Sequence, residues 1–334
     1  MFTQINKKEY LKLNGFQTQR AIKFIKDTFQ YYLAKNLKLL RVSAPLFVSK
    51  STGLNDDLSG VERKVDFSMK GSSDKLEIVQ SLAKWKRMAL KKYGFWEHTG
   101  LYTDMNAIRR DEDVDQIHSI YVDQWDWEKI ITKKDRTLNY LKETVRLICN
   151  AIAKTIKKMK TIYKRIDVDF NEDVFFITSE ELLKKYPTLT SKERENEICK
   201  EHKTVFIMQI GDKLSNGEPH DSRAPDYDDW KLNGDLLVYN TVLDKAVELS
   251  SMGIRVDSKS LLTQLVKANK EDKLEFDFHK SILNNSLPLT IGGGIGQSRL
   301  CMYILKKGHI GEVHASVWNE KNIEFCKENN LELL

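Results

Sequence analysis

The sequence predicts a mixed α/β protein, of the α+β type, folded as a single domain over residues 1–334. Two long stretches repeat apolar residues at three and four positions, which is the period of an amphipathic helix. Several shorter apolar or alternating runs are typical of strands. No internal repeat, low-complexity segment or Pro/Gly-rich linker divides the chain. These observations favour one compact unit of strands and helices.

The helical period predicts two long helices, at residues 14–34 and 136–165. Shorter runs have the alternation or the continuous apolar character of strands. Strands are expected at 38–48, 121–128, 174–178, 205–211, 235–240 and 246–256, with a change from strand to helix within 76–90 and a polar helix at about 179–201. Pro45 interrupts the first run, which predicts an edge strand or a strand end there.

The alternation in residues 121–128 gives a strand with two different faces. One face would carry Val122, Gln124, Asp126 and Glu128, and the other Tyr121, Asp123, Trp125 and Trp127. The acidic side is consistent with a solvent-exposed face. Aromatic and polar groups alternating in this way are equally consistent with the wall of a cleft.

The stretch Leu289–Leu305 combines glycines at 292, 293, 294 and 296 with an amphipathic helical pattern. The glycines predict a turn in which the backbone approaches a ligand closely, and the following helix would point free N–H groups at that ligand. Arg299 falls one turn into this helix, where a guanidinium can stack on a ring or bind phosphate oxygens. A glycine-rich turn before an ordinary core helix is the plain alternative.

Two familiar nucleotide-binding patterns do not fit this stretch. The dinucleotide fingerprint needs a third glycine where Gln297 stands, and the Gly-Lys-Ser/Thr of the phosphate-binding loop is absent. What remains is the pattern G-x-G-x-G-x-x-R, from Gly292 to Arg299. This pattern resembles the third signature motif of class II aminoacyl-tRNA synthetases, whose glycine-rich turn and arginine hold ATP.

Acidic residues elsewhere suggest a metal site. Asp235 and Glu248 lie on neighbouring expected strands, where two carboxylates can share one divalent cation, and Mg²⁺ prefers such oxygen ligands together with phosphates. Arg109 and Arg299 would clamp opposite ends of a triphosphate. Asp56 lies in the polar segment 53–60, for which turn formation is the plain alternative. The histidines have no zinc-binding spacing.

Composition excludes several classes of protein. Hydrophobic residues at 41%, charged residues at 31% and a mean hydropathy of −0.48 indicate a soluble protein. No apolar run approaches the ~18 residues of a membrane span. The net charge of +6 is mild for this length and does not argue for nucleic acid. The cysteines are widely spaced, which indicates reduced thiols and a cytoplasmic location.

Longer runs carry a more specific resemblance. They are Ser81–Arg87, Tyr121–Glu128, Arg223–Trp230, Leu249–Arg255 and Thr290–Leu300. These runs are similar to those of the ammonia-dependent asparagine synthetases (aspartate–ammonia ligases), a family related to class II aminoacyl-tRNA synthetases that lacks a tRNA-binding domain. The resemblance extends from about residue 15 to Trp318. The chain departs from the family between Trp230 and Leu232, where the family can carry a longer loop.

The resemblance implies a fold and a reaction. The fold would be an antiparallel eight-stranded sheet flanked by helices, in a homodimer. The reaction would make asparagine from aspartate, ATP and ammonia through β-aspartyl-AMP, releasing AMP and pyrophosphate, with Mg²⁺ as the metal. No nucleic acid or membrane partner is expected.

The resemblance also assigns residues to roles. The catalytic set would be Arg109, Asp56, Gln124 and Arg299. The aspartate pocket would contain Asp56, Ser81, Lys86, Gln124, Asp228, Ser250 and Arg255. The nucleotide would contact Arg109, Asp235, Glu248, Leu249, Ser251, Gly294, Gly296 and Arg299, and Asp235 and Glu248 would also hold Mg²⁺. The base that accepts the ammonia proton stays open between Asp56 and Asp126.

Two other functions are compatible with such a scaffold. One is an enzyme that activates aspartate for a different acceptor, but it would normally add an anticodon-binding domain. The other is a catalytically inactive binding protein, which the presence of both arginines and all named carboxylates disfavours. Glutamine as nitrogen donor would require a nucleophilic cysteine, whereas Cys149 and Cys301 lie in helical patterns and are expected to be packing residues. Free ammonia is therefore the expected donor.

Overall fold

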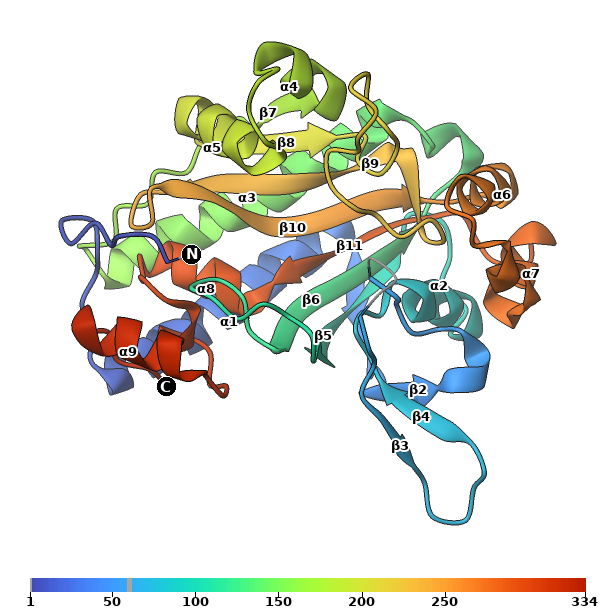
Figure 1. The fold of residues 1–334 in the computed structure, drawn as a ribbon, viewed down its shortest axis with the longest axis horizontal. Helices are drawn as coiled ribbons and strands as arrows, with labels where there is room; N and C mark the ends of the chain where they lie inside the picture. The colour runs from blue at the N-terminus through green and yellow to red at the C-terminus, as the bar shows by residue number, and fades with distance from the viewer. Residues whose placement is uncertain (1, 59–61) are drawn as a thin grey trace.

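A computed structural model describes residues 2–58 and 62–334. In this part of the chain, one eight-stranded sheet has the order β1-β5-β6-β11-β10-β9-β8-β7, and a three-stranded sheet has the order β2-β4-β3. Helices flank the large sheet, and the small sheet projects from it at the lower right of Figure 1. The expected mixed fold is confirmed. Residues 59 and 60, the end of the expected polar turn, lie outside the described range.

The elements follow one another along the whole chain. The strands are β1 (Leu39–Arg41), β2 (Phe47–Ser49), β3 (Asp66–Ser68), β4 (Lys75–Ile78), β5 (Gly100–Ile108), β6 (Tyr121–Ile130), β7 (Phe175–Thr178), β8 (Thr204–Met208), β9 (Asp228–Asn240), β10 (Lys245–Arg255) and β11 (Thr290–Gly296). The helices are α1 (Gly15–Leu37), α2 (Ala83–Lys92), α3 (Leu138–Ile162), α4 (Ser179–Lys185), α5 (Ser191–His202), α6 (Ser258–Lys267), α7 (Asp277–Leu283), α8 (Gln297–Ile304) and α9 (Glu320–Glu328).

The large sheet is antiparallel through its centre, from β5 to β8. Its two edges differ from the expected pattern, because β1 pairs with β5 and β7 pairs with β8 in parallel. Each of these edge pairs is joined by a long connection that contains helices, and such a crossover permits parallel pairing where a hairpin does not. The centre of the sheet, which carries the long strands, has the expected direction.

The glycine-rich stretch is a strand, and the expected turn is wrong. Residues 290–296 form β11 in the middle of the sheet, paired with β6 on one side and β10 on the other. None of its glycines has a positive φ angle. Glycine is present here for a reason other than conformational freedom, and the candidate site below supplies it.

Three other boundaries differ from expectation. The polar helix at 179–201 is two helices, α4 and α5, because the chain breaks at Pro187, where proline cannot continue a helix. The run 38–48 is divided between β1 and β2, which belong to different sheets. The loop that was expected to extend to Trp230 ends at Asp228, where β9 begins and then runs through 230–232 without interruption.

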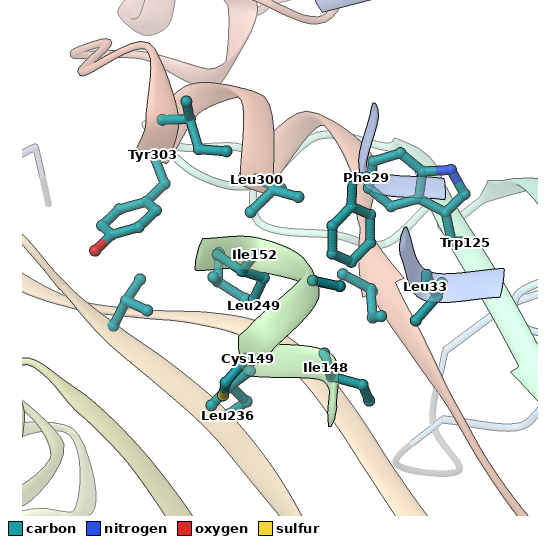
Figure 2. Packing of buried hydrophobic residues seen from close by; sticks show 14 of the residues in the cluster. Phe29, Leu33, Trp125, Ile148, Cys149, Ile152, Leu236, Leu249, Leu300 and Tyr303 are labelled. Carbon is teal, nitrogen blue, oxygen red and sulfur yellow. The ribbon is translucent and has the colours of Figure 1, made fainter. Parts of the chain in front are cut away.

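The main core lies between one face of the large sheet and the helices α1, α3 and α8. Figure 2 shows how the central turn of α3 meets side chains from the sheet and from the other two helices. The labelled residues are Phe29, Leu33, Trp125, Ile148, Cys149, Ile152, Leu236, Leu249, Leu300 and Tyr303. Among the described residues, no helix is both long enough and apolar enough to cross a membrane. Part of the opposite face packs against α4 and α5 in a second hydrophobic cluster, and another part lines a cavity.

Replacing Ile152 with alanine tests this core. Ile152 is fully buried in the middle of α3, so Ile152→Ala should lower the free energy of unfolding by about 2–5 kcal/mol, through lost transfer energy and the cavity left behind. Ile162, at the end of the same helix, is 51% exposed, and Ile162→Ala should change stability by only about 0.5 kcal/mol. Urea unfolding followed by circular dichroism measures both. Equal losses would contradict the assignment of α3 to the core.

Candidate active site

A cavity of about 420 Å³ opens on the face of the large sheet away from the main core. The alternation of β6 explains its position, because Gln124 and Asp126 line the cavity while Trp125 and Trp127 are buried in the core on the other face. The two-faced strand expected from the sequence is therefore confirmed, and its polar face is a cleft wall rather than open surface. Asp123 belongs to the opposite face, yet at the end of the strand it reaches the same cavity.

The cavity gathers nearly all residues singled out in the sequence. Its lining includes Asp56, Ser81, Lys86, Arg109, Gln124, Asp228, Asp235, Glu248, Leu249, Ser251, Arg255, Gly294, Gly296 and Arg299. Ser250 is not part of the lining. It is buried, and its hydroxyl donates to the carbonyl of Gly294 at 2.9 Å. Ser250 thus holds the backbone of β11, and its expected contact with aspartate stays a prediction.

A guanidinium held by two carboxylates forms the deepest charged group. Arg255, on β10, donates from Nε and Nη2 to Glu128 at 2.7–3.1 Å, and from Nη1 to Asp228 at 2.5 Å. The exposed fraction of Arg255 is 2%, and that of Glu128 is 0%. Burial alone would raise the pKa of Glu128, but Arg255 more than offsets this and the pKa is lowered. At Asp228 burial outweighs the two nearby arginines, and the pKa is raised.

The glycines of β11 make room for this group. A Cβ atom added at Gly292 would come within 3.0 Å of both Glu128 and Arg255. At Gly294 an added Cβ would meet the side chains of Gln124 and Asp126 in the same way. The register places Gly292 opposite Glu128 and Gly294 opposite Asp126 on β6. The glycine pattern therefore empties a strip of the sheet so that polar side chains of β6 can enter the cavity.

A buried lysine lies against the same strip. Lys86, on α2, is 1% exposed and donates to the carbonyl of Gly293 at 2.9 Å. Its Nζ also lies 3.4 Å from Asp126 and 4.0 Å from Glu128. Burial lowers the pKa of Lys86, and these two carboxylates partly counteract that effect.

Asp56 reaches the cavity from the loop after β2. One of its carboxylate oxygens accepts from the Ser81 hydroxyl at 2.7 Å, and the other accepts from the Leu58 amide at 2.9 Å. The neighbouring Asn55 accepts from the Asp56 and Gln80 amides at 2.9 and 2.8 Å, which fastens this loop to the end of β4. Asp56 can therefore both form a turn and line the cavity.

Arg299 and Arg109 are held differently from Arg255. Arg299 donates to the carbonyls of Ile117 at 3.4 Å and Glu248 at 3.1 Å, so main-chain groups from two segments fix its guanidinium. Arg109 follows β5 and lies 3.9 Å from Glu112. Within residues 2–58 and 62–334, its buried Nε has no hydrogen-bond partner. The Arg109 side chain lines the cavity, so its charge is close to any ligand there.

The N-terminus of α8 does not offer a free anion site. The amide of Ser298 donates to Asp123 at 3.0 Å, and the Ser298 hydroxyl donates to the same carboxylate at 2.8 Å. An internal carboxylate therefore takes the place that an external phosphate was expected to occupy. At this end of the cavity, a ligand has the Arg299 side chain available rather than the helix amides.

Asp235 and Glu248 line the cavity from β9 and β10. Glu248 pairs in register with Leu237, so its side chain and that of Asp235 are diagonal neighbours on one face. Asp235 accepts from Arg223 at 2.6 Å. No group of three or more histidine, cysteine or acidic side chains in the described residues is arranged to hold a metal ion. Two carboxylates bind a divalent cation weakly by themselves, and phosphate oxygens supply the further ligands that Mg²⁺ prefers.

Comparison with known proteins identifies the family. The family model described as aspartate-ammonia ligase matches residues 16–330. The aspartate–ammonia ligase of Clostridium perfringens is 60% identical over 319 residues, which are 95% of this chain and 95% of that protein. The Clostridium tetani protein of the same name is 57% identical over 98% of this chain and 96% of its own length. The chain belongs to the aspartate–ammonia ligase family.

Solved structures support the fold of this ligase family member. The asparaginyl-tRNA synthetase of Pyrococcus horikoshii, complexed with asparaginyl-adenylate, has a TM-score of 0.66 at 14% identity, covering 90% of this chain and 70% of that one. The Entamoeba histolytica asparaginyl-tRNA synthetase with the same ligand has a TM-score of 0.60 at 16% identity, covering 89% of this chain and 66% of that one. The expected likeness to class II synthetases is confirmed at the level of the fold.

Sequence reasoning missed two residues of this ligase site. The strand alternation puts Glu128 on one face but assigns it no role. Arg223 belongs to the run Arg223–Trp230, which carries the family resemblance, and also has no role of its own there. The available signal for Glu128 was its place on the same strand face as Gln124 and Asp126. Nothing local indicates the partner of Arg223, since its contact with Asp235 depends on how the preceding segment folds back.

The cysteines do not form a nucleophilic centre. All four are free and buried, and burial raises the pKa of Cys149, Cys301 and Cys326 to about 12. The pKa of the Cys199 thiol is also raised by burial. None of them lines the cavity. The expectation that Cys149 and Cys301 are packing residues is confirmed.

Replacing Glu128 with glutamine tests the buried pair. Leaving Arg255 with one charged partner fewer should cost about 3–5 kcal/mol of stability near neutral pH. Because the pKa of Glu128 is lowered in the fold, its contribution is present above the ordinary value of 4.5 and is lost as the pH falls below it. Denaturant unfolding of both proteins should therefore give a difference that shrinks in acid.

A matched control is Asp27→Asn, which also converts a carboxylate to an amide in an ion pair. The Asp27–Lys23 pair is exposed, with side-chain exposures of 54% and 79%. Its loss should change stability by less than about 1 kcal/mol. A Glu128→Gln protein as stable as this control would contradict the proposed importance of the buried pair.

Proposed function

We propose that this protein is an aspartate–ammonia ligase that makes asparagine from aspartate, ATP and ammonia. The observation that carries the proposal is the 60% identity over 95% of the chain to proteins of that name. The cavity supports it, since a single space holds charged groups suited to an amino acid at one end and to a nucleotide at the other. The enzyme would form a C–N bond and would act on small molecules.

The proposed reaction has two steps. The β-carboxylate of aspartate attacks the α-phosphorus of ATP, forming β-aspartyl-AMP and breaking the bond to pyrophosphate. Ammonia then attacks the activated carbonyl, and AMP leaves. Negative charge gathers on the phosphorus in the first step, so the catalytic contribution is positive charge placed where it develops. In this proposal Arg109, whose side chain lines the cavity, supplies that charge.

The aspartate end would be the cluster around Arg255. Aspartate carries two carboxylates and one ammonium, so it needs both cationic and anionic partners. Lys86 and Arg255 would face the carboxylates, whereas Asp56 and Asp228 would face the ammonium. Gln124 and Ser81 would add neutral hydrogen bonds. Since Asp228 already pairs with Arg255, binding would require these two residues to share their contacts with the substrate.

The nucleotide end would be built around Arg299. Its guanidinium, fixed by two carbonyls, is available to pack on the base or contact phosphate. Leu249, Ser251, Gly294 and Gly296 would complete the nucleotide contacts. Asp235 and Glu248 would hold Mg²⁺ together with phosphate oxygens, and the ion would neutralise charge on the phosphates when bound.

A homodimer in the cytoplasm is part of the same proposal. Large apolar side chains remain exposed on the outer surface of α1 and on β1, at 72% for Phe16, 59% for Tyr31 and 64% for Leu40. A second copy of the chain would cover such a surface. The mass of the protein in solution, measured by light scattering, tests this point independently of activity.

The function is tested by incubating pure protein with ATP, Mg²⁺, aspartate and ammonium. Asparagine, AMP and pyrophosphate should form in equal amounts, because aspartate attacks the α-phosphorus, which stays bonded to the ribose. ADP and free phosphate in their place would contradict the mechanism. With glutamine as sole nitrogen source and ammonium removed, asparagine should not form. At fixed total ammonium, the rate should rise above neutral pH, because only NH₃ is a nucleophile.

Two alanine substitutions on β11 should separate the two ends of the cavity. Gly292→Ala would push against Glu128 and Arg255, so it should raise KM for aspartate by about tenfold or more, as expected when about 1.4 kcal/mol of binding is lost. Gly296→Ala would meet the Arg299 side chain at 3.2 Å and should affect KM for ATP instead. Steady-state kinetics at saturating co-substrate measure both. The same response in both variants would contradict the division of the cavity.

A further inference from the structure

Arg223 occupies the acidic wall at the nucleotide end of the cavity. Its Nη2 lies 2.6 Å from Asp235 Oδ1, and its Nη1 donates to the hydroxyl of Ser251. The side chains of the ion pair are 11% and 10% exposed. Both partners of Arg223 are residues to which the proposed function assigns metal or nucleotide contacts. A guanidinium of the chain and an incoming cation would therefore use the same carboxylate.

The donors of Arg223 are incompletely used in this position. Its Nε is buried and has no hydrogen-bond partner among the residues that the structure describes, which is costly for a charged donor. Arg223 also lies close enough to Asp228 for that carboxylate to help raise the pKa of the guanidinium, in addition to Asp235. The side chain thus stands between the acids of the nucleotide end and those of the aspartate end. It lines the cavity beside Asp235, Glu248 and Ser251, which the proposed function places at the nucleotide.

The segment that carries Arg223 is anchored at its other side. His220 is buried and its Nε2 lies 3.1 Å from Glu195 on α5. Lys192, on the same helix, lies 3.1 Å from Glu195 and 3.5 Å from Asp221. These contacts fix the residues just before Arg223. The ion pair of Arg223 with Asp235 holds the other end of this segment, and a change of partner releases that end.

We propose that Arg223 is an exchangeable counter-ion: it neutralises Asp235, yields this carboxylate to a divalent cation, and then binds phosphate oxygens of the nucleotide. The proposal rests on the proposed function for the identity of the nucleotide end. A second positive charge close to Asp235 opposes metal binding by Coulomb repulsion and by occupying an oxygen ligand. The planar fork of arginine suits both a carboxylate and a phosphate, so the exchange replaces one charge-assisted pair with another.

The test measures binding of Mn²⁺ alone, without nucleotide, by the electron paramagnetic resonance signal of the free ion. Arg223→Gln removes the competing cation, and Mn²⁺ affinity should increase by about tenfold or more, the scale on which one adjacent charge changes a carboxylate equilibrium. Arg223→Lys keeps the charge and should stay near the wild-type affinity. Adding Asp235→Asn to the glutamine variant should abolish the gain. Asparagine formation should fall in Arg223→Gln, opposite in direction to the metal affinity.

Arg136 provides a matched control. It forms an ion pair with Asp229 at 2.8 Å, both side chains are 10% exposed, and neither residue lines the cavity. Arg136→Gln should therefore leave Mn²⁺ binding unchanged. Equal Mn²⁺ affinities for the wild type and Arg223→Gln would overturn the proposal. If the affinity rises as expected but no asparagine is made by the wild type, the counter-ion role stands and the proposed function is rejected.

A measurement on the wild type covers the case in which Arg223→Gln does not fold. Release of Arg223 from Asp235 should loosen the residues around it, so amide hydrogen exchange in peptides covering 211–224 should accelerate when Mn²⁺ is added. Peptides from α3 should not change under the same conditions. Unchanged exchange in 211–224 at a Mn²⁺ concentration that saturates the protein would overturn the proposal.

Discussion

One guanidinium, that of Arg255, holds together the floor of the cavity. Its contacts with Glu128 and Asp228 link β6, β9 and β10, and a carboxylate on either side compensates the burial of its charge. The contact is possible only because Gly292 and Gly253 leave space beside it, since a Cβ at either position would collide with this group. The ion cluster therefore fits only because the strands carry glycine at these two positions.

This arrangement also explains why the large sheet has two unlike faces. One face is covered by α1, α3 and α8 and is almost entirely apolar, so it supplies the rigidity of the platform. The other face carries charged groups at positions set by strand register rather than by loops. A site built on paired strands keeps its geometry better than one built on mobile segments. Arg223, which comes from the segment before β9, is the part of the wall with an alternative partner.

Local patterns in the sequence were sufficient for much of this. The alternation of Gln124 and Asp126 with Trp125 and Trp127 predicted two faces correctly, because side chains alternate along any strand. The family resemblance added residues that no period reveals, and all of them except Ser250 line the cavity. Their roles remain proposals, since position in a cavity does not by itself assign chemistry.

The predictions that were wrong, and the contacts that were not predicted, have a common physical cause. A glycine-rich run is compatible both with a turn and with a strand that accommodates neighbouring side chains, and only the pairing of β11 with β6 and β10 distinguishes them. The Arg255–Glu128 contact joins residues 127 positions apart, and Asp123 takes the α8 amide from 175 positions away. Such contacts follow from the register of the completed sheet. Pro187 is a local signal for a helix break. The helical period continues on both sides of it, however, so one helix was predicted instead of two.

Because the cysteines are buried, their reactivity can report local unfolding of the protein. Cys149, Cys199, Cys301 and Cys326 lie on four different helices, α3, α5, α8 and α9, of which α3 and α8 share the main core. A thiol that is both covered and poorly ionised reacts with a disulfide reagent only after its surroundings separate. The order in which the four thiols become labelled would therefore rank these helices by the ease with which each detaches from the folded chain.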